Sequence, residues 1–250
     1  MQSWTKYIKE KVVSERIIVA LDLKGYDNII SLVESLKEAV WFKVGAVNFT
    51  AYGISLIEEL KKRNKKIFLD LKYHDIPNTV KGAVQAAASL GVDMLTVHSI
   101  GGVDMMVKAK EAVKEFEDKN GKKGPEVAAV TVLTSMNDEN LKRDMFIELT
   151  VEETVLRLAK NALKAGISAI VASAKETALL RENFGDYFKI ITPGIRPVWA
   201  AKNDQKRVVT PKDAIRLGSD FIVIGRPIYG DKNPQKAFEM IRKELEDVNT

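Results

Sequence analysis

The sequence contains no cysteine, only two histidines and no apolar run of membrane-spanning length. The lack of cysteine excludes disulfide scaffolds, thiolate metal sites and thiol catalysis. With only His74 and His98 available, a three-histidine metal centre is excluded as well. The first residues lack the apolar core of a secretory signal peptide, so the sequence predicts a cytoplasmic protein with no membrane partner.

The sequence also lacks a strong excess of charged residues of one sign. The 250 residues include 39 Lys and Arg against 34 Asp and Glu, a net charge of +5, and no long block of one sign occurs. Nucleic-acid binding favours a clustered basic stripe, so we expect no nucleic-acid partner. The mild positive charge is compatible with small anionic ligands.

What is present is an alternation of strand and helix patterns. Eight short apolar or β-branched runs have the length and composition of strands buried on both faces. They are Arg16–Leu21, Trp41–Val44, Lys66–Lys72, Met94–His98, Glu126–Val132, Ser168–Ala172, Lys189–Thr192 and Phe221–Ile224. Between them, apolar residues recur at helical spacing. Examples are Val80, Ala83, Val84 and Ala87, then Val151, Val155, Leu158, Ala162 and Ala165, and finally Ala237, Met240, Ile241 and Leu245.

Eight strands that each precede a helix, over about 230 residues, predict an α/β protein with a (β/α)8 TIM barrel. We place this single domain at residues 15–250, after an N-terminal arm or helix at residues 1–14. A doubly wound open sheet is the alternative, because a count of strands does not show closure.

Charged residues gather where the predicted strands end, which is the functional end of a barrel. Side chains alternate along a strand, so Asp70 and Lys72 share one face. A structural ion pair is one interpretation, because buried opposite charges are costly unless paired. Asp75 shortly after them and Lys43 on the preceding strand favour an active site instead.

An alternating array of lysines and aspartates suits one kind of chemistry. The carboxylates keep the lysines charged despite burial. A charged ammonium group can stabilise a developing carbanion and then donate a proton to it. The array is therefore a cofactor-free means of breaking a bond that leaves a carbanion.

The loops after the seventh and eighth strands often hold phosphate in this fold. Here they carry Gly194 with Arg196 and Gly225 with Arg226. Glycines let backbone N–H groups approach an anion, and arginine binds it through two charge-assisted hydrogen bonds. Two surface arginines beside ordinary turns are the alternative. The segment 193–207 is interpreted either as a lid that brings in Gln205 or as a plain surface loop.

Other polar residues at strand ends have two interpretations each. Asp22 either binds a hydroxyl group or caps the next turn. Thr134 and Ser135 either hydrogen-bond a ligand or start the following loop. For His74 and His98, a satisfied structural histidine is the commoner role.

Taken together, these residues resemble orotidine 5′-phosphate decarboxylase. The segment Phe68–Val80, FLDLKYHDIPNTV, is similar to that family's Asp-x-Lys-x-x-Asp signature nearly letter for letter. Supporting matches follow in the family's order over nearly the whole chain. They are Val19–Asp22, Phe42–Gly45, Val97–Gly102, Thr131–Met136, Thr192–Pro197, Asp204 with Gln205, and Ile224–Ile228.

The resemblance implies a (β/α)8 homodimer that converts orotidine 5′-monophosphate to UMP and CO2, the last step of pyrimidine nucleotide synthesis. It implies neither a metal nor an organic cofactor. Lys72 would donate a proton to C6 of the pyrimidine and Asp70 would lie near the departing carboxylate. Lys43 would link the acids and touch the ribose. Asp75 and Thr79 would come from the neighbouring subunit and contact the ribose.

The resemblance also assigns residues to the two ends of the substrate. For the ribose and pyrimidine these are Asp22, Thr134 and Ser135, and for the phosphate Arg196, Gln205, Gly225 and Arg226. One departure stands beside them: Val198–Asn203 replaces the Gln-Gly of many bacterial members, although the spacing from Arg196 to Gln205 is kept.

Two other functions compete. Related barrels that act on hexulose or gulonate phosphates share the signature but use Mg²⁺ to hold an enediolate. Their extra metal-binding acid belongs early in the barrel, where this sequence has Lys43. The other is a non-catalytic sensor of phosphate ligands on the same fold. A sensor has no need of Lys72, so the sequence favours the decarboxylase.

Overall fold

The computed structural model describes residues 13–200 and 209–246. Its eight parallel strands follow one another in chain order and form a closed barrel, which confirms the predicted (β/α)8 architecture over the open sheet. The strands are β1 (Ile17–Ala20), β2 (Trp41–Gly45), β3 (Lys66–Tyr73), β4 (Met94–His98), β5 (Glu126–Val130), β6 (Ala169–Val171), β7 (Lys189–Thr192) and β8 (Phe221–Ile224).

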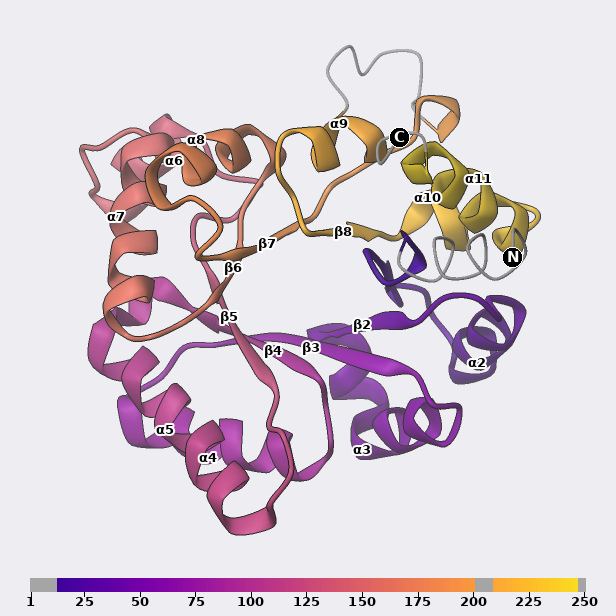
Figure 1. The fold of residues 1–250 in the computed structure, drawn as a ribbon, viewed down its shortest axis with the longest axis horizontal. Helices are drawn as coiled ribbons and strands as arrows, with labels where there is room; N and C mark the ends of the chain where they lie inside the picture. Colours follow the sequence, from indigo (N-terminus) through magenta and orange to yellow (C-terminus); the bar gives the residue numbers. More distant parts are fainter. Residues whose placement is uncertain (1–12, 201–208, 247–250) are drawn as a thin grey trace, which may run out of the picture. The chain divides into compact units, whose positions relative to one another are not determined.

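Helices alternate with these strands along the chain (Figure 1). They are α2 (Tyr26–Ser35), α3 (Ala46–Lys62), α4 (Pro77–Ser89), α5 (Gly102–Asn120), α6 (Asp138–Met145), α7 (Val151–Lys164), α8 (Ala174–Phe184), α9 (Pro211–Arg216), α10 (Arg226–Tyr229) and α11 (Pro234–Glu246). Two short 3-10 turns, η1 (Ser99–Gly101) and η2 (Val198–Ala200), follow β4 and β7.

Contacts within the chain divide it into two compact units, residues 1–68 with 194–250 and residues 69–193. In the first unit, β1 pairs with β2 on one side and with β8 on the other. In the second, β4, β5, β6 and β7 form consecutive pairs. The arm or helix predicted at residues 1–14 stays a prediction, because residues 1–12 lie outside the described residues.

The predicted helical stripes largely match the buried faces of the helices. In α4, Val80, Val84 and Ala87 are buried at the predicted spacing. The prediction was wrong at Met240 in α11, whose surface is 40% exposed, because Phe238 fills the core there instead. Residue spacing identifies a helix face only to within about one position, since 3.6 residues per turn leave neighbours at its edge ambiguous.

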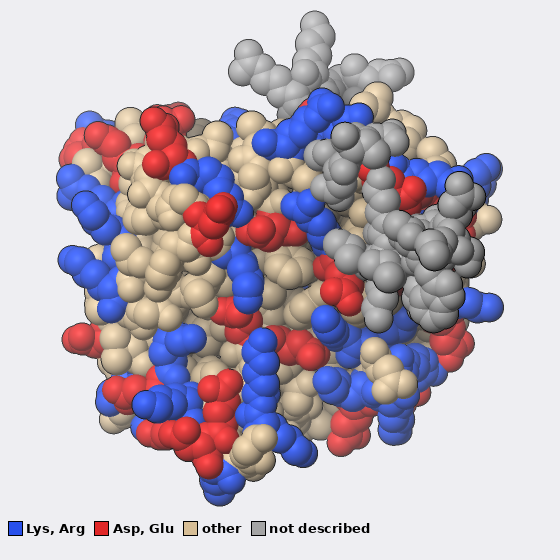
Figure 2. Space-filling view, in the orientation of Figure 1, with Lys and Arg blue, Asp and Glu red and all other residues tan. Residues whose placement is uncertain are grey.

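Charged side chains of both signs are interspersed over the face that Figure 2 shows. This matches the mixed composition of the sequence, with 39 basic and 34 acidic residues. Among the described residues, no helix is both long and apolar enough to cross a membrane.

The amino ends of β5, β6 and β7 are joined by one carboxylate. The Ser168 hydroxyl donates to Glu126 Oε1 at 2.6 Å, and Lys189 Nζ donates to Glu126 Oε2 at 2.7 Å. Burial alone would raise the pKa of Glu126, but the hydrogen bonds from Lys189 and Ser168 and the charges of Lys189 and Lys110 together outweigh burial and hold this pKa below its ordinary value. This end of a barrel serves stability rather than catalysis.

We expect Glu126→Gln to lower the free energy of unfolding by about 1–3 kcal/mol at pH 7, because the charged partner of Lys189 is lost. A carboxyl whose folded pKa is depressed stabilises the fold above its unfolded pKa, about 4.3 for Glu, and loses that contribution as pH falls through the folded pKa. Urea denaturation at neutral pH and at about pH 3 therefore gives a difference that shrinks on acidification. The exposed Glu139→Gln is the control, and an equal loss at both pH values would contradict the assignment.

Candidate active site

An ion pair lies at the carboxyl half of β3. Lys72 Nζ is 2.9 Å from Asp70 Oδ1, and the side chains are 38% and 13% exposed. The alternation along the strand predicted that these two side chains share a face, and their contact agrees with that prediction. The ammonium group is held by the carboxylate and still reaches solvent, as a proton donor to a bound ligand must.

The backbone of Lys72 is in the left-handed region, with φ of 50°. Only three non-glycine residues with positive φ occur in the described chain, and Lys72 is the one within a strand. This conformation costs a side-chain-bearing residue about 1–3 kcal/mol and persists only where surrounding contacts enforce it. Such strain is concentrated at functional sites, so it marks Lys72 independently of the sequence motif.

The neighbouring strand β4 contributes Thr96 and, at its end, His98. The hydroxyl of Thr96, which is fully buried, lies 2.8 Å from the Lys72 backbone nitrogen and 3.1 Å from Asp70 Oδ1. The sequence analysis missed Thr96, although alternation from His98 would have placed it on the same face of β4.

His98 and His74 lie with their ring centroids 5.8 Å apart. Burial, then the charges of His74 and Lys72, lower the pKa of His98 from its ordinary value. His98 is therefore neutral at neutral pH. Among the described atoms, its buried Nδ1 has no hydrogen-bond partner.

Beyond β3, the chain lines a pocket of about 300 Å³ with Lys72, His74, Asp75 and Thr79 among its residues. Asp75 Oδ1 accepts a hydrogen bond from the backbone N–H of Ile76 at 2.6 Å, which fixes the turn into α4. Asp75 and Thr79 are exposed. Lys72 and Asp75 of one chain thus line one pocket, and the assignment of Asp75 to the neighbouring subunit's site stays a prediction.

Thr134 and Ser135 lie in an exposed turn after β5, just before α6. No contact of their side chains distinguishes a ligand-binding role from the start of a loop, so their assignment stays a prediction.

In the other unit, Lys43 Nζ is 3.1 Å from Asp22 Oδ1. Lys43 is 12% exposed and Asp22 is 52% exposed. Gly45 leaves room for this pair, because a Cβ atom there would lie 3.1 Å from Lys43 Nζ and 3.4 Å from Asp22 Oδ1. The loop that carries Asp22 is held by buried Asn48, whose amide donates to the carbonyl oxygens of Leu21 and Leu23. The sequence analysis missed Asn48.

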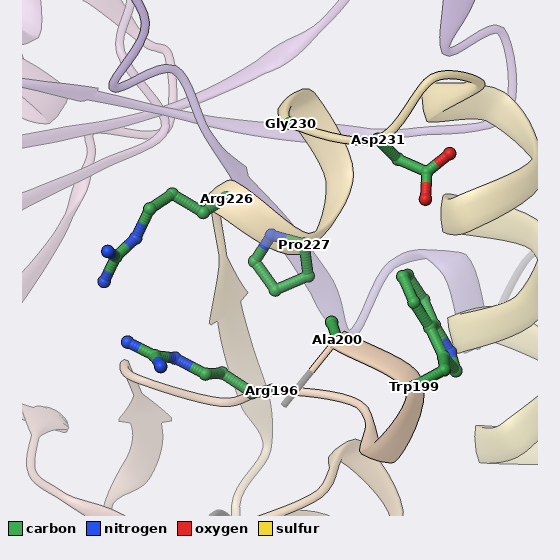
Figure 3. A pocket seen from close by; sticks show the side chains of 7 residues that line it. All are labelled: Arg196, Trp199, Ala200, Arg226, Pro227, Gly230 and Asp231. Carbon is green, nitrogen blue, oxygen red and sulfur yellow. The ribbon is translucent and has the colours of Figure 1, made fainter. Parts of the chain in front are cut away.

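Arg196 and Arg226 line one pocket of about 380 Å³, together with Trp199, Ala200, Pro227, Gly230 and Asp231. In Figure 3 both guanidinium groups point to the same side of the pocket, whereas the carboxylate of Asp231 points away from them. Two guanidinium groups on the same side of one pocket are suited to a dianion such as a phosphate monoester. The two arginines, predicted from separate loops, therefore line one pocket, and their role in phosphate binding stays a prediction.

Gly225 lies where the chain leaves β8. A Cβ atom on it would be 3.2 Å from the Tyr229 ring and 3.4 Å from the Ala20 side chain. Burial, then the charge of Asp22, raises the pKa of the Tyr229 hydroxyl. The sequence analysis missed Tyr229, which carries no motif signal.

Gln205 and most of the predicted lid tip lie outside the described residues. What is described of the segment continues from Arg196 through η2, and the Arg196 backbone N–H donates to the carbonyl of Val209 at 3.2 Å.

Within residues 13–200 and 209–246, no three His, Asp or Glu side chains form a group that could hold a metal ion. Two of the acidic residues at the strand ends form ion pairs, Asp70 with Lys72 and Asp22 with Lys43.

Residues 15–241 match the model of the orotidine 5′-phosphate decarboxylase / HUMPS family. An orotidine 5′-phosphate decarboxylase of Nostoc sp. is 45% identical over 235 residues, which cover 94% of this chain and 99% of the relative. That of Geobacter sulfurreducens is 48% identical over 233 residues, covering 92% and 96%. The crystal structure of the Lactobacillus acidophilus enzyme superposes with a TM-score of 0.81 at 40% identity, covering 92% and 98%.

The matched residues include Lys43, Asp70 and Lys72 on strands β2 and β3, and Arg226 at the start of α10. The chain therefore belongs to the orotidine 5′-phosphate decarboxylase / HUMPS family.

Proposed function

We propose that this protein decarboxylates orotidine 5′-monophosphate to UMP and CO2, in pyrimidine nucleotide synthesis. The observation that carries the proposal is the Lys72–Asp70 pair at 2.9 Å, in a chain whose near-full-length relatives are named orotidine 5′-phosphate decarboxylases. In the reaction, the bond from C6 to the carboxylate breaks and its electron pair stays on C6. The Lys72 ammonium then gives its proton to C6.

Each charged residue has its own role in the reaction. The Lys72 ammonium stabilises the negative charge that develops at C6 before it donates the proton. Asp70 keeps the ammonium oriented and lies near the departing carboxylate. Lys43 links the acids and contacts the ribose, and Asp22 contacts the ribose hydroxyl groups. Support for the Asp22 role comes from its exposed carboxylate, fixed 3.1 Å from Lys43.

The phosphate is assigned to Arg196, Arg226, Gly225 and Gln205, and the remaining ribose and pyrimidine contacts to Thr134 and Ser135. The two guanidinium groups that line one pocket support the phosphate assignment. Binding energy from this remote group can position the pyrimidine for reaction, since it is available before the chemistry begins.

We also propose a homodimer in which Asp75 and Thr79 complete the neighbouring subunit's site. Asp75 and Thr79 are exposed, and Ile76 between them is 68% exposed. A large apolar side chain exposed between two polar ones suits a surface that a second copy covers.

The test of the activity is the ultraviolet absorbance change of orotidine 5′-monophosphate on addition of protein, with and without EDTA. We expect rapid loss of substrate that EDTA leaves unchanged. If no loss occurs, the decarboxylase proposal fails. Hexulose and gulonate phosphates with Mg²⁺ are then the substrates to assay.

The cytoplasmic location expected from the sequence stays a prediction.

Replacing Arg226 with alanine is expected to weaken UMP binding by about 10- to 100-fold, because a charge-assisted hydrogen bond to the phosphate is lost. The affinity for uridine, which has no phosphate, should change little. Competition of each ligand with substrate measures both affinities, and exposed Arg216→Ala in α9 is the matched control. An equal loss for UMP and uridine would remove Arg226 from the phosphate site.

A further inference from the structure

The hydroxyl group of Thr96 is shared between the backbone of the proton donor and the carboxylate beside it. Its oxygen accepts a hydrogen bond from the Lys72 backbone N–H at 2.8 Å. Its own proton is directed to Asp70 Oδ1 at 3.1 Å, the same oxygen that Lys72 Nζ contacts at 2.9 Å. Three groups therefore close a small ring: the Lys72 main chain, the Thr96 hydroxyl and the Asp70–Lys72 ion pair.

The direction of each hydrogen bond in this ring is fixed by chemistry. A backbone N–H only donates and an ionised carboxylate only accepts, so the hydroxyl must accept from Lys72 and donate to Asp70. Thr96 is 0% exposed, so no water can easily replace either bond. A valine of the same shape could make neither of them.

The backbone conformation of Lys72 gives this hydroxyl a specific task. With φ of 50°, Lys72 departs from the strand conformation on either side of it, and its N–H is directed to a side chain on β4. A left-handed residue with a side chain persists only where its surroundings hold it there. The bond from the Lys72 N–H to the Thr96 hydroxyl supplies such a restraint from a side chain on the neighbouring strand.

We propose that Thr96 is a positioning residue of the active site. Its hydroxyl holds the Lys72 main chain in the left-handed conformation and at the same time orients the Asp70 carboxylate, so that Nζ is fixed relative to the pyrimidine. Thr96 itself touches no reacting atom in this proposal. Its effect on turnover rests on the proposed decarboxylase function, whereas its effect on the geometry of Lys72 does not.

The experiment compares Thr96→Val, which removes the hydroxyl at constant shape, with Thr96→Ser, which keeps it. The matched control is Thr177→Val in α8. Thr177 is also 0% exposed, but its hydroxyl donates to the carbonyl of Ser173 at 3.1 Å and lies 3.5 Å from the Thr192 hydroxyl, away from Lys72 and Asp70 in the hydrogen-bond network. Thermal unfolding, kcat and KM for orotidine 5′-monophosphate and inhibition by UMP are measured for each variant.

We expect Thr96→Val to lower kcat by about 10- to 100-fold, because misplacing a reacting group by about 1 Å has an effect of this size. KM and UMP inhibition should stay within about threefold of the wild type, since the phosphate and ribose contacts are untouched. Thr96→Ser should restore kcat to within about threefold, and Thr177→Val should lose stability without losing kcat.

Two kinetic results would overturn the proposal. One is a Thr96→Val variant with wild-type kcat, and the other is an equal loss of kcat in the serine and valine variants, which would indicate packing of the methyl group. A crystal structure of Thr96→Val provides a readout that needs no turnover. It should show Lys72 φ outside the left-handed region, or Nζ more than hydrogen-bond distance from Asp70 Oδ1. An unchanged Lys72 would refute the proposal even if the wild type proved inactive on orotidine 5′-monophosphate.

Discussion

Lys72→Ala is expected to reduce kcat for orotidine 5′-monophosphate by at least about 10⁴-fold, because one group supplies both the proton and the stabilising charge at C6. Binding of UMP should weaken by no more than about tenfold, since the product has no carbanion for Lys72 to stabilise. Single-turnover kinetics and equilibrium binding of UMP separate the two quantities.

A second variant separates the two functions of the ammonium group, its positive charge and its proton. Lys72→Arg keeps a positive charge beside Asp70 but releases no proton at neutral pH, so its kcat should also stay low. Exposed Lys142→Ala, which loses only the surface pair with Glu148, is the matched control. Equal losses in turnover and in UMP binding for Lys72→Ala would contradict the proton-donor role.

A mixture of two inactive variants, Lys72→Ala and Asp75→Ala, is expected to regain activity. If Asp75 serves the neighbouring subunit's site, each hybrid dimer has one site that lacks both residues and one that is complete. Random exchange of equal amounts makes about half of the dimers hybrid, so about a quarter of all sites should be active. The measurement is specific activity against the time of mixing.

The control for this experiment is a mixture of Lys72→Ala with Asp70→Ala. Both residues lie on β3 of one chain and contact each other, so a hybrid of these variants restores no complete site. Subunit exchange is followed separately with two distinguishable tags. Complete exchange without recovery of activity for the Lys72 and Asp75 pair would place Asp75 in its own subunit's site.

The fold could be predicted from the sequence because each strand is a short apolar run bounded by polar turns. The bounds of β4, β7 and β8 agree with the prediction residue for residue. The predicted ends of β5 and β6 extended one or two residues too far. Thr131 and Ala172 still make backbone hydrogen bonds to the neighbouring strands, so apolar composition continues past the regular ladder.

The site was predictable only where a charged residue interrupts an apolar strand. Asp70, Lys72 and Lys43 stand out for that reason, and the two Gly-Arg turns stand out by repetition. Thr96 does not stand out, because a threonine within a β-branched run is typical of any buried strand. The φ angle of Lys72 could not be predicted either, since alternation gives the face of a side chain but not a local dihedral angle.

The left-handed backbone of Lys72 lowers the folding stability of the protein at the same residue that its proposed chemistry requires. Glycine would adopt this conformation without steric cost, whereas a residue with a side chain adopts it at a steric cost. Selection for folding alone would therefore discard the lysine first, and only the requirement for turnover retains it. Family members that have lost the activity are thus expected to accumulate changes at this residue, and at the threonine that restrains it, before changes in the surrounding barrel.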